Sequence, residues 1–116
     1  MVNITNLETT EARHAAVYTA EQHLRRHGAS LCDLLDALDD KSGFGALCDL
    51  HSAFGQPIAD PDIVERALRD IHRVLAGQAP SALERISRER GLHANDMTRW
   101  HGARISEIIA RFRHGD

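Results

Sequence analysis

The chain has 116 residues and a formal net charge of −3, which suits a single domain and excludes a protein that coats nucleic acid indiscriminately. Apolar residues make up 42% of the sequence and aromatic residues only 4%. This is not the composition of a disordered chain, and its core must be built from aliphatic side chains, which favours packed helices over a β-sandwich.

The charge is unevenly distributed along the chain. Residues 1–58 contain four basic and eight acidic residues, a net charge of −4, whereas residues 81–114 contain seven arginines and four acids, a net charge of +3. We therefore expect one helical domain, 1–116, with an acidic half, 1–58, and a second half, 59–116, that carries a basic C-terminal hairpin.

The location expected from the sequence is the cytoplasm. Neither a basic start followed by an apolar run nor a stretch of about 20 apolar residues is seen, so no secretory signal and no membrane span are predicted. Cys32 and Cys48 are then expected to be reduced thiols.

A first helix is predicted over residues 5–28. Thr5 and Glu8 have the spacing of a capping box, in which a hydroxyl and a carboxylate satisfy amide donors at a helix start. Apolar residues then recur at helical spacing, at Ala16, Val17, Ala20 and Leu24. Gly28 is expected to end this helix in a left-handed conformation.

Two further short helices are predicted before residue 55. The first covers residues 30–40, where Ser30 and Asp33 repeat the capping pattern. Its apolar stripe consists of Leu31, Leu34, Leu35 and Leu38. The segment KSGFG, residues 41–45, is expected to break the chain, and a short helix follows over residues 46–54.

The second half of the chain predicts two or three helices. Residues 60–77 are the clearest, with Asp60 as N-cap and Pro61 at the first helical position. A capping box at Ser81 and Glu84 is expected to start the next helix, which stops at Gly91. The last runs from Ala94 or Asn95 to Phe112, with a kink or a break at Gly102 because glycine weakens a helix interior.

No alternating strand pattern is present, so the predicted fold is all-α, a bundle of five to six short helices with a possible C-terminal helix-turn-helix. Gly91 fits the turn of that motif, and Leu92 can fill the core beside it. Met97 and Trp100 fall where the second helix would pack on the first.

DNA binding is the first functional hypothesis, because Asn and Arg side chains pair with adenine and guanine edges and arginines bind phosphates. The protein would be a small regulator of phage or mobile-element type that binds double-stranded DNA, with a homodimer as the expected assembly, without cofactor or enzymatic activity. The residues expected to contact DNA are Arg88, His93, Asn95, Arg99, Arg104 and Arg111.

Two residues oppose this hypothesis. Arg90 lies where a helix-turn-helix normally buries an aliphatic side chain, and Asp96 would point a carboxylate at the phosphates. The alternative is a helical hairpin whose arginines are solvated or paired with the neighbouring acids Glu84, Glu89 and Glu107.

The second functional hypothesis is a non-enzymatic protein-binding module, such as a phage-encoded inhibitor of a host defence complex of the anti-CRISPR type. An acidic surface would occupy a nucleic-acid-binding groove on the host complex. The residues expected to form it are Asp33, Asp36, Asp39, Asp40 and Asp49. Their other interpretation is that they keep the protein in solution.

Zinc binding and catalysis are less favoured. Two cysteines and three histidines have local spacings compatible with a structural zinc site, namely His23, His27, Cys32, Cys48 and His51. No CxxC pair supports such a site, so no metal is predicted, and Cys48 with His51 does not by itself make an oriented catalytic pair. The eight histidines are interpreted as ordinary surface residues.

The segment TTEARHAAVYTAEQHLRRHGASLCDLLDAL, residues 9–38, resembles a helical hairpin of small uncharacterised phage and prophage proteins of GC-rich bacteria. The matching residues are Ala15, Ala16, Ala20, Leu24, His27, Gly28, Asp33 and Leu34. The segment departs from that pattern at Ala29 and Ser30, where an aliphatic residue more often follows the glycine. The resemblance implies two helices separated at Gly28 and a mobile-element setting, and it implies no activity.

Overall fold

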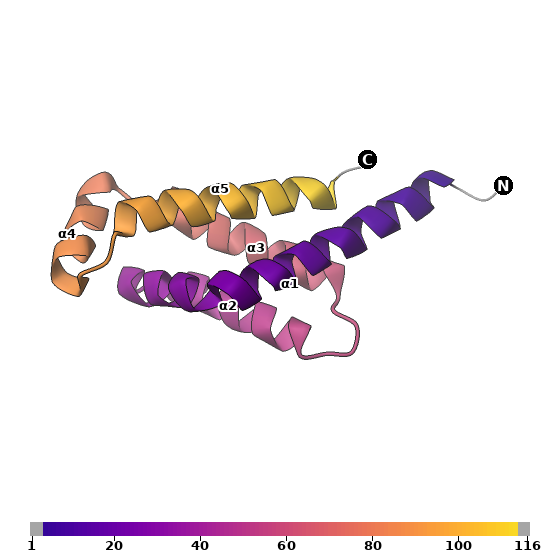
Figure 1. Cartoon of the computed structure of the whole chain (residues 1–116), viewed down its shortest axis with the longest axis horizontal. Coiled ribbons are helices and arrows are strands. Elements are labelled where there is room, and N and C mark those ends of the chain that lie inside the picture. Colours follow the sequence, from indigo (N-terminus) through magenta and orange to yellow (C-terminus); the bar gives the residue numbers. More distant parts are fainter. Residues whose placement is uncertain (1–3, 114–116) are drawn as a thin grey trace.

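The structure is a computed structural model that describes the backbone of residues 4–113, and over this range the chain forms five helices and no strand (Figure 1). The all-α prediction is confirmed, although the first helix, at 35 residues, is not short. The helices are α1 (Ile4–Leu38), α2 (Lys41–Phe54), α3 (Pro61–Ala76), α4 (Pro80–Arg90) and α5 (Ala94–Phe112).

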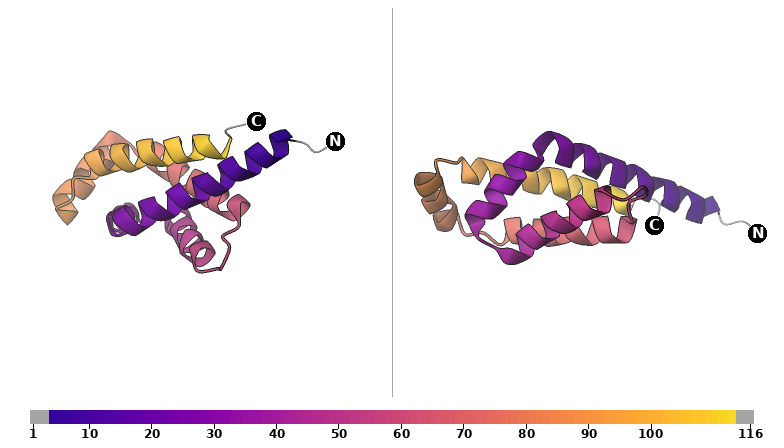
Figure 2. Two further views of the ribbon diagram at one scale, coloured as in Figure 1. Left: turned by 45° about the vertical axis from the view of Figure 1, so that its right-hand side comes forward. Right: turned by 90° about the horizontal axis from the view of Figure 1, so that it is seen from below.

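The molecule is elongated, with principal extents of 59 × 25 × 21 Å. Helices α1 and α5 run antiparallel along its length, so α1 begins near the end of α5 (Figure 1). Helix α4 lies at the opposite end, α3 runs behind the α1–α5 pair, and α2 packs against α3. Figure 2 shows that α1 is not straight, because its second half bends toward the start of α2.

Helix α1 continues through Gly28, so the predicted stop at this residue is wrong, as are the hairpin that the resemblance implied and the Ser30–Asp33 cap. The apolar stripe explains why. It continues across Gly28 at helical spacing, and one unbroken helix buries all of it. The buried members of the stripe are Ala16, Ala20, Leu24, Leu31, Leu34 and Leu35. The predicted capping box at Thr5 and Glu8 lies outside the side chains that the structure describes.

The junction of α1 and α2 is at Asp39 and Asp40. Asp39 takes a left-handed conformation with φ 54°, which ends α1. The Asp40 carboxylate accepts hydrogen bonds from the backbone amides of Ser42 and Gly43, at 2.9 and 3.2 Å, and so caps α2. The hydroxyl of Ser42, which donates to the same carboxylate at 2.6 Å, and then the two backbone bonds lower the pKa of Asp40.

Helix α2 therefore begins at Lys41 rather than at residue 46, and the predicted break over residues 41–45 is wrong. Gly43 is buried within it. A Cβ on this glycine would lie 3.1 Å from Leu35 Cδ2 and 3.2 Å from Val74 Cγ1. Glycine at this position lets α2 approach α1 and α3 closely, which is a packing role rather than the role of a helix breaker.

The structure confirms the prediction of a helix capped by Asp60, which is α3. The Asp60 carboxylate accepts a hydrogen bond from the Asp62 amide at 2.9 Å, and Pro61 occupies the first turn. The carboxylate of Asp62 in turn pairs with Arg13 of α1, which lowers the pKa of Asp62 and raises that of Arg13.

Helices α4 and α5 are joined by a three-residue turn, residues 91–93. Gly91 has φ 68° and ends α4 as predicted. The Ser81–Glu84 capping box is wrong, because the N-cap is Ala79 and makes no side-chain bond. The Ser87 hydroxyl donates to the Leu83 carbonyl at 2.9 Å and accepts from the Ala94 amide at 3.0 Å, which fixes the start of α5 on α4.

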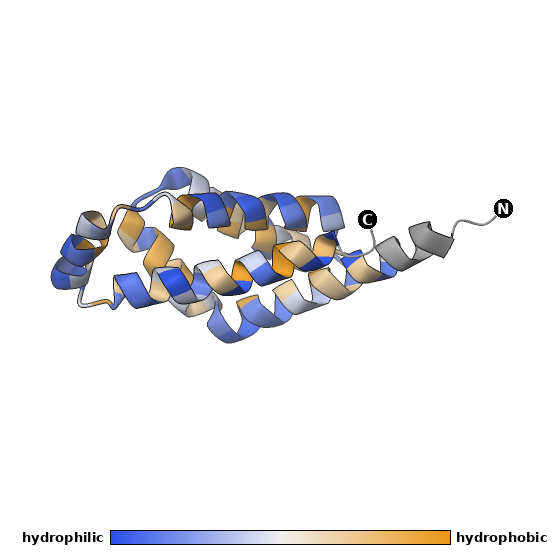
Figure 3. Ribbon diagram, turned by 90° about the horizontal axis from the view of Figure 1, so that it is seen from above, coloured by the Kyte–Doolittle hydropathy of each residue, from blue (hydrophilic) through white to orange (hydrophobic). Residues whose placement is uncertain are grey.

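Apolar and polar stretches alternate along the helices (Figure 3). The buried apolar side chains form one core. Val64, Ile71 and Ile105 are fully buried in it. None of the helices, over the residues described, has both the length and the apolar character needed to cross a bilayer.

Helix α5 continues through Gly102 without the predicted break. A Cβ on Gly102 would meet nothing within 4 Å. Gly102→Ala should therefore raise the free energy of unfolding by about 1 kcal/mol, the difference in helix propensity between the two residues. Urea denaturation followed by circular dichroism measures this.

The matched control is Gly43→Ala, which makes the same change inside α2. The added methyl group would press on Leu35 and Val74, so this variant should lose about 1 kcal/mol, because overpacking outweighs propensity. Equal gains in both variants would contradict the close approach of α2.

Candidate functional site: a basic and aromatic groove between α1 and α5

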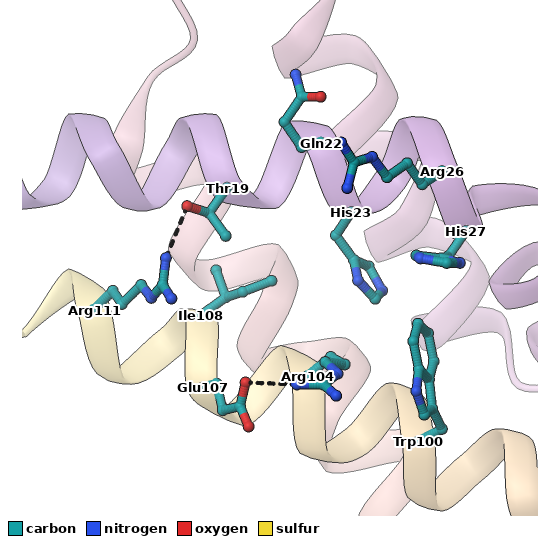
Figure 4. Close-up of a pocket in the computed structure, with 10 residues that line it drawn as sticks. All are labelled: Thr19, Gln22, His23, Arg26, His27, Trp100, Arg104, Glu107, Ile108 and Arg111. Atoms are coloured by element: carbon teal, nitrogen blue, oxygen red, sulfur yellow. Dashed lines mark hydrogen bonds and ion pairs between the residues drawn. The ribbon is translucent and has the colours of Figure 1, made fainter.

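A groove of about 270 Å³ lies between the antiparallel helices α1 and α5 (Figure 4). Residues three, four and seven apart on a helix share a face, and both helices place such sets in the groove. The lining residues are Thr19, Gln22, His23, Arg26 and His27 of α1, and Trp100, Arg104, Glu107, Ile108 and Arg111 of α5.

Three arginines make the groove basic. Arg26 comes from α1, and Arg104 and Arg111, seven residues apart, come from the same face of α5. Glu107 is the one acid among the residues that line the groove, and Arg104 Nη1 donates to it at 3.1 Å. Arg111 Nη1 donates to the Thr19 hydroxyl at 3.1 Å. The groove thus keeps an excess of positive charge on a protein whose net charge is negative.

A cluster of rings forms one end of the groove. The ring of His23 stacks on Trp100, with centroids 5.6 Å apart and planes 23° from parallel. The rings of His27 and His101 meet Trp100 edge to face at 4.6 and 5.0 Å. The Arg104 guanidinium carbon lies 5.7 Å from the Trp100 centroid, within the range of a cation–π contact.

His101 is the buried member of this cluster, with only 1% of its surface exposed. Its Nε2 lies 3.0 Å from the Ser30 hydroxyl, and its Nδ1 lies 3.4 Å from Nε2 of His23. Burial, and then the charges of His23 and His27, lower the pKa of His101 to about 4. The expectation that the histidines are surface residues is wrong for His101.

His23 is shifted in the same direction as His101. Burial lowers its pKa, and the nearby charges of His27 and Arg104 add to the effect. His23 and His101 are therefore neutral at pH 7, and the arginines dominate the positive charge of the groove at that pH.

The residues predicted to contact DNA do not share one face. Arg104 and Arg111 lie together in the groove, whereas Arg88 is exposed on α4. His93 is the exposed N-cap residue of α5, and Asn95 is half-buried in its first turn.

The outward face of α5 carries few groups that read bases. Arg99 is exposed there and lies 3.7 Å from the carboxylate of Asp96. Ala103, Ser106 and Ala110 are exposed along this face, and Arg113, directly after the helix, is exposed at the same spacing. Trp100, predicted to pack on α4, instead contacts rings of α1. Between Arg99 and Arg113, this face would present only small side chains to a major groove.

The residues predicted to bind a protein partner are also divided. Asp36, Asp39 and Asp40 line a cavity of about 310 Å³ at the α1–α2 junction, beside Phe44. Asp33 and Asp49 are exposed but do not line it. Asp36 lies 3.5 Å from Arg90, and Asp40 is engaged as the cap of α2.

The cysteines and histidines considered for zinc are not gathered into one site. Cys32 is half-buried against the core, Cys48 is exposed, and His51 lines a third cavity beside Phe54. Among the described residues, no group of three or more His, Cys, Asp or Glu side chains is placed to hold a metal ion.

Sequence reasoning missed Arg26, His101 and the groove itself. The signal that was available is the spacing of Thr19, His23 and Arg26, which places them on one face of α1. Nothing in the sequence indicated that this face meets the Arg104 face of α5.

Comparison of the chain with protein-family models, with curated proteins and with solved structures gives no match.

Proposed function

We propose that the protein binds nucleic acid as a small DNA-binding regulator, and that the α1–α5 groove, rather than the outward face of α5, holds the phosphates. The observation that carries this proposal is the meeting of Arg26, Arg104 and Arg111 around an exposed tryptophan. Arginine guanidinium groups bind phosphate oxygens, and aromatic rings beside them are typical of nucleic-acid-binding grooves.

The local charge supports binding despite the net charge of −3. Three guanidinium groups face one carboxylate in the groove, so an anionic backbone would meet a favourable potential there. Arg104 donates to Glu107 at 3.1 Å, just as Arg99 is paired with Asp96 at 3.7 Å, so the excess positive charge of the groove comes from Arg26 and Arg111.

A protein-binding role through the acidic residues has weaker support. Of the five aspartates, Asp40 is engaged in capping, Asp36 is near Arg90, and Asp33 and Asp49 lie outside the cavity that the others line. They do not form one uncommitted acidic surface of the kind that would mimic a nucleic acid.

The test measures the affinity of the protein for a labelled duplex with a single-stranded overhang, by fluorescence anisotropy at about 50 and 200 mM salt. With three phosphate contacts, the wild type should lose about 20- to 40-fold in affinity over this range. Arg104→Ala/Arg111→Ala removes two contacts, so it should bind more weakly at low salt and lose only about 3-fold over the same range.

The matched control is Arg88→Ala/Arg99→Ala, which makes the same change in net charge on the face predicted for a helix-turn-helix. It should retain most of the salt dependence of the wild type. A greater loss in this variant than in the groove variant would place the contacts on α4 and the outer face of α5 and contradict the proposal. No binding by the wild type at 50 mM salt would overturn nucleic-acid binding altogether.

A further inference from the structure

Trp100 stands between two cavities. It lines the arginine groove, and it also lines a second cavity of about 420 Å³ on the side toward the start of α5. His27 is shared in the same way. The other residues that line the second cavity are Ser30, Asp96, Met97 and His101.

The two cavities differ in charge. The groove is lined by Arg26, Arg104 and Arg111, whereas the one carboxylate among the residues that line the second cavity is that of Asp96, which lies 3.7 Å from Arg99. A phosphate is therefore attracted more strongly to the first than to the second. A flat, neutral group with hydrogen-bond donors at its edge suits the second, because it can stack on the indole and donate to Asp96.

The two faces of the indole are not equivalent. His23 stacks on Trp100, and Figure 4 shows His23 and Arg104 on the same side of the indole plane. The side chain keeps 39% of its surface exposed, and it also lines the second cavity, which His23 does not line. A planar ligand can therefore reach the indole from the second cavity without displacing His23.

From this arrangement we propose that the site takes an unpaired nucleotide, with its base stacked on Trp100 in the second cavity and its phosphate on Arg26 and Arg104 in the groove. The inference rests on the proposed function and specifies its ligand. A base amino group would donate to the Asp96 carboxylate, which is a contact that carboxylates make with cytosine, and one that thymine, without an amino group, lacks.

Unpaired bases are required because a duplex covers both faces of every internal base. Stacking on Trp100 then requires a base to leave the helix stack, at a cost of a few kcal/mol that a single strand does not bear. A single strand should therefore bind roughly 10- to 100-fold more tightly than a blunt duplex of the same sequence, in line with measured base–aromatic stacking contributions.

The chain contains one tryptophan, so its intrinsic fluorescence reports directly on this site. The experiment titrates the full-length protein with a short mixed-sequence single strand, with the corresponding blunt duplex, and with cytidine monophosphate. We expect the single strand to quench the fluorescence and to bind at least 10-fold more tightly than the duplex. Equal affinity of the monophosphate and the strand would identify a free nucleotide as the ligand, whereas weaker binding of the monophosphate would identify a strand.

Substitutions of Trp100 test the stacking contact without changing the charge of the site. Trp100→Ala should weaken binding of a labelled single strand by about 10-fold or more, and Trp100→Phe should lose much less because it keeps an aromatic face. The control is Tyr18→Ala, which removes an exposed aromatic side chain on α1 that lines neither cavity. This variant should bind with unchanged affinity.

The outcomes distinguish this inference from the proposed function. Equal binding of single strand and duplex, without quenching, would overturn the unpaired-nucleotide site while nucleic-acid binding through the arginines stands. Absence of binding to either would overturn both. Equal losses in Trp100→Ala and Tyr18→Ala would also overturn the assignment of Trp100.

Discussion

Acidification from pH 6.5 to pH 4 should lower the free energy of unfolding by about 3 kcal/mol through His101 alone. Burial among His23, His27 and Ser30 lowers the pKa of His101 from 6.5 to about 4. Above pH 6.5 the ring is neutral in both the folded and the unfolded chain. Between pH 6.5 and 4 only the unfolded chain takes up the proton, so each step down in pH favours unfolding.

The measurement is urea denaturation at constant ionic strength and several pH values between 7.5 and 4. His101→Gln keeps a polar side chain that can bond to Ser30 but removes the titrating ring, so its curve should be markedly flatter over this interval. His51→Gln, which changes an exposed histidine, should keep the wild-type curve. Parallel curves for the wild type and His101→Gln would contradict a neutral, buried His101.

The carboxylates of Asp40 and Asp62 affect the free energy of unfolding in a lower pH range. Hydrogen bonds lower the pKa of Asp40 and Asp62 below 3.8, so the stability that they contribute is present above that value and is lost only as the pH falls further. His23 acts in the same direction as His101, because burial also lowers its pKa, so we expect some pH dependence to remain in His101→Gln. The interval between pH 6.5 and 4 therefore reports mainly on the histidine cluster.

The sequence predicted helices best where local and tertiary signals agree. Helix α3 matches its prediction closely because the Asp60 cap, Pro61 and one full amphipathic face all favour the same segment. At Gly28 the signals conflict. Its left-handed potential favours a stop, but the apolar stripe continues through it, and burial of Leu31, Leu34 and Leu35 outweighs the cost of one glycine inside the helix.

The groove was harder to predict because it depends on which helices pair. Arg104 and Arg111 were recognised as candidates, but their partners Arg26 and His23 lie about 80 residues earlier in the chain. His101 had no distinguishing feature in the sequence among eight histidines, and only its packing under Trp100 and beside Ser30 sets it apart. Residue type indicated which side chains could bind an anion, whereas the tertiary structure determined which of them lie in the same site.

Ile105→Ala should lower the free energy of unfolding by about 3 kcal/mol. Ile105 is fully buried on the inner face of α5, one turn after His101. Truncation of its side chain leaves a cavity and loses the transfer free energy of the buried methyl and methylene groups. The two effects together cost about 2–5 kcal/mol in protein cores, with a central value of about 3 kcal/mol. Urea denaturation at pH 7.5 measures the loss.

The matched control is Ile63→Ala on α3, which removes the same atoms from a residue that is 41% exposed and should cost less than about 1.5 kcal/mol. Ile105 lies on the same helix as Trp100 and Arg104, so the truncation should also loosen the α5 wall of the groove. The intrinsic fluorescence of Trp100 should therefore shift to longer wavelength in Ile105→Ala but not in Ile63→Ala. Similar losses of stability in the two variants would contradict the placement of Ile105 in the core, and with it the packing that holds the arginine face of α5 against α1.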